Sequence, residues 1–108
     1  MRLTDEMRAD VAARVEEDVG ALGPVHRRAL LAAAITSYAK AVQRVAPGDA
    51  AATPEVHAPA HLYIEVLRDA VYPGIDLKRW QRLGWSNVTA GRTQVDRFFA
   101  KVDAFLDA

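Results

Sequence analysis

The sequence predicts an all-α fold, and three observations lead to that prediction. Hydrophobic residues make up 51% of the 108 residues, and many of them are alanines, which favour helices. Apolar residues recur at helical spacing in several stretches, and no stretch sustains the alternation of a β-strand. A chain of this length fits one domain with a modest core. We therefore expect a single domain over residues 1–108, a compact bundle of four main helices and one short helix, at 4–19, 24–46, 58–72, 76–83 and 87–107.

The first helix is predicted at 4–19, with the hydroxyl of Thr4 as its cap. Asp5 and Glu6 stand in its first turn, where acidic side chains favour the positive end of the helix dipole. Apolar residues recur at every fourth position, so one face is apolar and the other is acidic. This stripe consists of Leu3, Met7, Val11, Val15 and Val19.

The second helix is predicted at 24–46, because Gly20 and Gly23 allow a turn and Pro24 suits a first helical position. Its apolar seam has the spacing of helices that pack at a shallow angle. The seam consists of Leu31, Ile35, Tyr38, Val42 and Val45. Alanines widen its apolar surface and permit close approach by more than one neighbour, so we expect this helix at the centre of the bundle. A homodimeric coiled coil through the seam is the alternative.

A loop rich in proline and alanine is predicted at 47–58, because Pro47 and Gly48 stop the second helix. Within this loop Pro54 could start one helical turn. Pro59 lacks a backbone donor and clashes with the preceding turn, so we start the third helix near residue 58 and end it at residue 72. The residues expected to face inward are Leu62, Val66 and Ala70, and also Tyr63 and Leu67.

The short helix at 76–83 can be capped by Asp76 and ended by Gly84 in the left-handed conformation, with Trp85 folding back as the hydrophobic contact. Ser86 can then cap the last helix, at 87–107, which Gly91 could interrupt. The apolar residues of that helix follow helical spacing closely and are Val95, Phe98, Phe99, Val102, Phe105 and Leu106.

Charge is unevenly distributed, although the formal net charge is zero. Residues 5–18 contain six acidic residues and two arginines, a balance of −4. Residues 78–101 contain six cations and one aspartate, a balance of +5. Such asymmetry can steer a charged partner over about 8–10 Å at cellular salt. The alternative is intramolecular, with the acidic first helix lying near the basic end.

The sequence offers no catalytic or metal-binding motif. There is no cysteine, so disulfides and thiolate metal sites are excluded. His57, His61 and Glu65 are four residues apart and would align on a continuous helix, but we expect Pro59 to leave His57 outside it. His26 has no serine or aspartate partner at a suggestive spacing, and there is no glycine-rich phosphate loop. We therefore predict a protein that is not an enzyme and holds no metal or cofactor.

No stretch approaches the roughly 18 apolar residues of a membrane span, and the first ten residues lack the apolar core of a signal peptide. We expect a cytoplasmic protein without a membrane partner.

Both tryptophans and the densest run of cations lie in residues 77–93. Tryptophan and arginine are the residues that dominate protein-binding hot spots. The main hypothesis is therefore a small regulatory protein-protein interaction module, such as an adaptor, an inhibitor or an assembly subunit. Its predicted partner-binding residues are Lys78, Arg79, Trp80, Arg82, Trp85 and Arg92.

The same stretch carries a second pattern, formed by Leu83, Gly84, Ser86, Thr89 and Arg92, with Trp85 at the apolar turn position. It resembles the helix-turn-helix signature of bacterial repressors and related DNA-binding domains. The resemblance implies a glycine turn followed by a recognition helix whose first turns reach base edges or phosphates. The alternative function is thus a small DNA-binding transcriptional regulator that would normally act as a dimer. Its DNA-binding residues would be Ser86, Asn87, Thr89 and Arg92.

This chain departs from the signature in three places. Trp80 stands where the family has alanine at the helix crossing, Gly91 lies inside the expected recognition helix, and Thr93 replaces an apolar residue. Ala90 and Gly91 leave the room that an indole at position 80 would need. We therefore expect Trp80 to pack against Ala90 and Gly91.

Overall fold

The computed structural model describes residues 4–44 and 54–108, and their regular structure is entirely helical. This confirms the predicted all-α class. The elements are α1 (Asp5–Val19), α2 (Pro24–Gln43), α3 (Pro54–Val71), α4 (Leu77–Arg82), the 3-10 helix η2 (Trp85–Asn87) and α5 (Arg92–Leu106).

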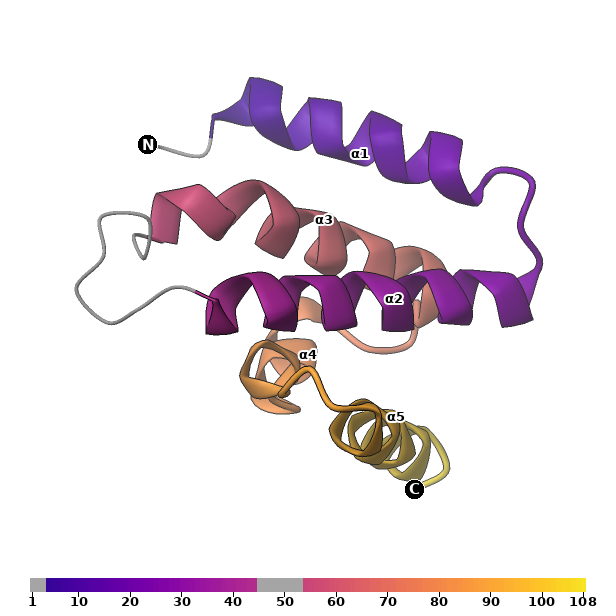
Figure 1. Ribbon diagram of the computed structural model, residues 1–108. Coiled ribbons are helices and arrows are strands. Elements are labelled where there is room, and N and C mark those ends of the chain that lie inside the picture. Colours follow the sequence, from indigo (N-terminus) through magenta and orange to yellow (C-terminus); the bar gives the residue numbers. More distant parts are fainter. Residues whose placement is uncertain (1–3, 45–53) are drawn as a thin grey trace.

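The helices form a bundle in which α3 packs against both α1 and α2 (Figure 1). On its other side α2 contacts α5 and η2, and α4 contacts η2 and α3. In Figure 1 the helix α1 lies at the top and α5 at the bottom, with α2 and α3 between them. Helices α1 and α5 therefore lie on opposite sides of the molecule, whereas α1 and α4 line a common hollow across α3.

Helix α1 begins as predicted, because the side chain of Thr4 accepts a hydrogen bond of 3.1 Å from the backbone N–H of Met7. Val15 and Val19 are buried, whereas Met7 and Val11 are half-buried. The four-residue repeat winds round the helix, so only its C-terminal half points fully into the core. Leu3, the first member of the predicted stripe, lies outside the described residues.

Helix α2 contributes Leu31 and Ile35 to the centre of the core, and both are fully buried. Further along the predicted seam, Tyr38 is half-buried and Val42 is 38% exposed. The seam is therefore buried over part of its length only. The helix ends at Gln43, and residues 45 and 46 of its predicted span lie outside the described residues.

Helix α3 begins earlier than predicted, at Pro54, and continues through Pro59. Residues 54–58 of the predicted loop are thus helical, and residues 47–53 lie outside the described part of the chain. Proline at position 59 removes one helical hydrogen bond and crowds the preceding carbonyl groups. Contacts of α3 with α1 and α2 offset this penalty, which local sequence alone cannot reveal.

The buried face of α3 also differs in part from the prediction. Leu67 is fully buried as expected, but the second deeply buried residue is Ile64. Two neighbours cover α3 from different sides, so its apolar stripe is wide and most of its members are half-buried. These half-buried residues are Leu62, Tyr63, Val66 and Ala70.

The turn after α4 follows the predicted pattern. Asp76 Oδ1 accepts a hydrogen bond of 2.7 Å from the N–H of Arg79, which caps the helix. Gly84 has a φ of 84°, a left-handed conformation that favours glycine, and Trp85 folds back into the core with 1% exposure.

The last helix begins later than predicted. Residues 85–87 form a 3-10 turn, residues 88–91 are not helical, and α5 begins at Arg92 with Gly91 as its N-cap. Ser86 therefore caps no helix. The N–H of Val88 donates a hydrogen bond of 3.3 Å to the carbonyl of Trp85, which closes a tight turn. The backbone after the buried Trp85 therefore turns and does not continue as a helix.

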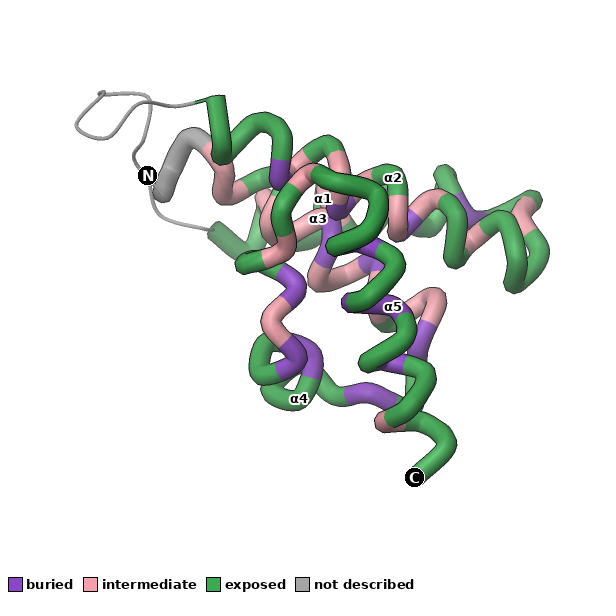
Figure 2. The backbone as a smooth tube through the Cα atoms, turned by 60° about the horizontal axis from the view of Figure 1, so that its bottom comes forward, coloured by how far each residue is buried: buried purple, intermediate pink, exposed green. Residues whose placement is uncertain are grey.

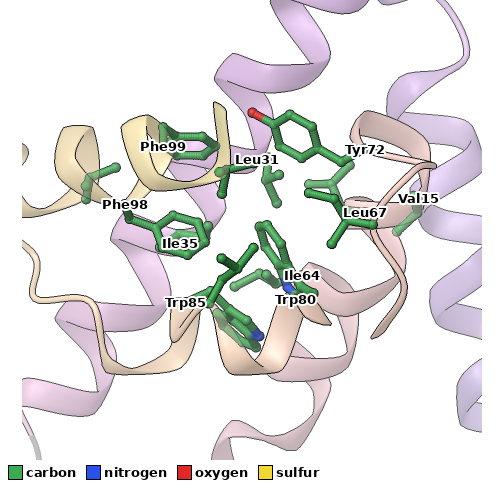
Figure 3. Packing of buried hydrophobic residues seen from close by; sticks show 14 of the residues in the cluster. Val15, Leu31, Ile35, Ile64, Leu67, Tyr72, Trp80, Trp85, Phe98 and Phe99 are labelled. Atoms are coloured by element: carbon green, nitrogen blue, oxygen red, sulfur yellow. The ribbon is translucent and has the colours of Figure 1, made fainter. Parts of the chain in front are cut away.

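Aromatic side chains fill the core between α2, α4 and α5 (Figure 3). The Trp80 and Trp85 rings stack with centroids 6.5 Å apart, and Phe98 meets Trp80 edge-on at 5.2 Å. Figure 2 shows the resulting pattern on α5, where buried positions alternate with an exposed outer side. Of the six predicted core residues of this helix, four are buried, while Phe105 is half-buried and Leu106 is 44% exposed.

A hydrogen bond of 2.7 Å from the hydroxyl of Tyr63 to Asp18 Oδ2 joins α3 to α1. Burial, followed by this hydrogen bond, raises the pKa of Tyr63 from 10.0 to about 12. A raised pKa means that the fold favours the neutral phenol, so its contribution to stability is complete below pH 10 and is lost as the pH rises to about 12.

We expect Tyr63→Phe to lose less stability than the parent between about pH 10 and about pH 12. Urea unfolding across this interval measures the difference in stability between the two proteins. Burial also raises the pKa values of Tyr38 and Tyr72, but both tyrosines are present in the parent and in the variant. Identical pH profiles would show that the phenol of Tyr63 ionises equally readily in the folded and unfolded states.

Candidate functional site

The tryptophans do not belong to a binding surface, which corrects the predicted partner-binding set. Trp80 is fully buried and Trp85 is 1% exposed. Their large apolar rings join α4 and η2 to the rest of the bundle, and their indole N–H groups have no hydrogen-bond partner among the described residues. The exposed charged residues of α4 and α5 are therefore the remaining candidates for a binding site.

Five exposed cations of α4 and α5 form what we call the basic face: Lys78, Arg79, Arg82, Arg97 and Lys101. Two contacts bring the helices together there. The guanidinium of Arg79 lies 4.9 Å from the ring centre of Phe105, and Lys101 Nζ donates a hydrogen bond of 3.3 Å to the carbonyl of Leu83. Arg97 is four residues before Lys101, so both project from the same side of α5. None of the five cations forms an ion pair with another described residue.

Arg92, a predicted member of both candidate sites, lies apart from the basic face. Its Nε is 3.9 Å from Asp96 Oδ2, and its side chain is 96% exposed. Asp96 belongs to the side of α5 that faces α2, where Arg28 pairs with Asp103 at 3.1 Å. The fold thus divides α5 into a basic side and an acidic side, which linear charge counting does not show.

The recognition helix implied by the helix-turn-helix resemblance is not formed. Ser86 and Asn87 lie in the 3-10 turn, Thr89 is in the non-helical segment, and Arg92 is the first residue of α5. These residues therefore do not share one helical face. The predicted packing of Trp80 against Gly91 is also wrong. A Cβ built on Gly91 would meet no atom within 4 Å, so no indole lies against this glycine.

Histidines His57 and His61 lie on one continuous helix, contrary to the expectation that Pro59 would separate them. They flank the Tyr38 ring at centroid distances of 6.2 and 5.9 Å. Within residues 4–44 and 54–108, however, no three histidine, cysteine or acidic side chains come together as metal ligands could.

Glu65 links α3 to α4. Its carboxylate lies 3.3 Å from Nδ1 of His61 and accepts a hydrogen bond of 2.7 Å from Nε2 of Gln81. The His61 ring in turn packs against Trp85, with ring centres 4.6 Å apart. Glu65, His61 and Gln81 therefore pack beside Trp85 at the edge of the aromatic core.

A groove between α1 and α2, floored by α3, was not expected from the sequence. Its volume is about 460 Å³. It is lined by Val11, Arg14, Asp18, Ala34, Ser37, Tyr38, Ala41, Pro59, Ala60, Tyr63 and Ile64. A signal for it existed in the alanines of the second helix, because Ala34 and Ala41 are seven residues apart and share a face. We call this feature the α1–α2 groove.

No helix in the described parts of the chain combines the length and the apolarity needed to span a membrane. Comparison of the chain with models of known protein families, with curated proteins and with solved structures finds no match.

Proposed function

We propose that this chain is a non-enzymatic interaction module that binds an acidic segment of a partner protein through the basic face. The observation that carries the proposal is the set of five exposed cations on two packed helices without ion-pair partners among the described residues. Charges that no neighbour neutralises raise the local concentration of an acidic ligand and speed its association.

A protein ligand fits this surface better than DNA does. Apolar groups accompany the cations, because Phe105 is half-buried under Arg79 and the adjacent Leu106 is 44% exposed. Leucine side chains of a partner can bury this apolar area, whereas a phosphate backbone cannot. The residues that would read bases in a helix-turn-helix do not share a helical face, so the fold gives no support to sequence-specific DNA binding.

The test uses the full chain and two fluorescent probes, a peptide of alternating glutamate and leucine and a duplex DNA of random sequence, at about 50 and about 200 mM salt. We expect the peptide to bind more tightly than the duplex. The double variant Arg82→Glu/Lys101→Glu should weaken peptide binding by about tenfold or more. Fluorescence anisotropy measures both affinities.

The matched control is Arg8→Glu/Lys40→Glu, which changes the net charge equally at exposed positions on α1 and α2. It should alter the peptide affinity by less than about twofold. Equal weakening by both double variants would mean that net charge, not the basic face, attracts the peptide. Tighter and more salt-dependent binding of the duplex would assign the face to nucleic acid and contradict the proposal.

A further inference from the structure

The α1–α2 groove lies between helices that share a neighbour. Both α1 and α2 pack against α3, while α5 and η2 contact α2 on another side. The groove walls run from Val11 to Asp18 on α1 and from Ala34 to Ala41 on α2. At a rise of 1.5 Å per residue each wall is about 10 Å long, or two helical turns.

Small side chains give this groove the form of a helix-docking site. Ala41 and Ser37 on α2 and Ala60 on α3 are exposed, so a ligand can approach close to the backbone of both helices. The floor is apolar, with Ile64 buried beneath it. An amphipathic helix can lay its apolar face into a groove of this kind.

Charge indicates which helix would fit. The α1 wall belongs to the acidic helix, and a neighbouring hollow that shares Arg14 and Asp18 is also lined by Asp10 and Glu17. Within the groove wall the charges of Arg14 and Asp18 balance, with Arg14 Nε 4.0 Å from Asp18 Oδ2, and Asp18 also accepts the hydrogen bond of Tyr63. Asp10 and Glu17 are exposed and form no ion pair with another described residue, so they can attract cations.

We propose that the α1–α2 groove docks an amphipathic helix of a partner protein that carries lysine or arginine beside its apolar stripe. A second copy of this chain is a poorer occupant, because the apolar stripe of its own basic helix α5 is buried in its core. The inference does not rest on the proposed role of the basic face, because no residue of the basic face lines the groove.

The test titrates the full chain into a labelled helical peptide of about 15 lysine and leucine residues with the leucines at helical spacing, and into a scrambled peptide of the same composition. We expect saturable binding about tenfold tighter for the amphipathic peptide. The groove-filling variants Ala41→Trp and Ala60→Trp should each weaken it by about tenfold or more, whereas Ala104→Trp, at an exposed site on α5, should change it less than about twofold.

Two further variants distinguish binding in the groove from binding at the basic face. Asp10→Asn/Glu17→Gln should weaken peptide binding by about three- to tenfold, more at low salt, and Arg82→Glu/Lys101→Glu should not weaken it. Circular dichroism shows which tryptophan variants remain folded, and the Asp10→Asn/Glu17→Gln variant tests the site without filling the groove.

Several results would overturn the inference. They are equal binding of the scrambled peptide, equal binding by the folded groove-filling variants, and absence of binding. A self-association detected by sedimentation and abolished by Ala41→Trp would make a second copy the occupant instead. Failure of the glutamate–leucine probe at the basic face would leave this result unchanged, so the two proposals can fail separately.

Discussion

Replacing Trp80 by alanine is expected to lower the free energy of unfolding by about 3–5 kcal/mol. The indole is fully buried and packs against three aromatic rings, those of Tyr72, Trp85 and Phe98, so its removal leaves a cavity where α4 meets α5. Domains of this size have total stabilities of about 5–15 kcal/mol. The variant should therefore be close to unfolding, which urea denaturation followed by circular dichroism will measure.

Two controls separate the loss of side-chain volume from the loss of the indole N–H. Trp80→Phe should be much less destabilising, because a phenyl ring fills most of the space and the lost indole N–H has no partner among the described residues. Lys78→Ala, at an exposed position of the same helix, should stay within about 0.5 kcal/mol of the parent. A parent-like unfolding midpoint for Trp80→Ala would show that this side chain does not occupy the core.

Replacing Arg68 by alanine is expected to destabilise the fold by about 1–3 kcal/mol. Its side chain is only 11% exposed, and its guanidinium donates from Nη1 to the carbonyl of Ile75, a fully buried residue in the turn between α3 and α4. Without the arginine this part-buried acceptor loses its partner. Thermal and urea unfolding will measure the loss.

The neighbouring ion pair is not the source of this effect. Arg68 Nη1 lies 3.7 Å from Asp69 Oδ1, but the aspartate side chain is 72% exposed, so water screens the pair. Asp69→Asn should change stability by less than about 0.5 kcal/mol. Arg68→Met, which keeps the apolar stem and loses the donor, should resemble Arg68→Ala. A destabilised Asp69→Asn with a stable Arg68→Met would reverse this assignment.

Local sequence signals located most helix boundaries because the groups that decide them are close neighbours. The hydroxyl of Thr4 and the carboxylate of Asp76 each cap the next turn, and Gly84 takes the left-handed conformation. These interactions span at most three residues, so the sequence predicts them directly.

The predicted helix starts were wrong where contacts between distant residues outweigh local backbone preference. Packing against two helices keeps α3 continuous through Pro59, and burial of Trp85 accompanies a 3-10 turn in place of a helix after Gly84. Burial of Trp80 and Trp85 also removes both tryptophans from the predicted partner-binding set. The sequence shows that both tryptophans lie within three residues of an arginine, but not which of these side chains face solvent.

Patterning of apolar residues and capping groups thus determined that this protein is a helical bundle, and charge counting showed that its two ends differ in sign. Only the tertiary structure decided that α1 lies away from α5, that Arg97 and Lys101 join Arg79 and Arg82, and that Arg92 does not. It also opened the α1–α2 groove. The physical reason is that helix periodicity relates residues within a few turns, whereas a binding surface is made where separate helices meet.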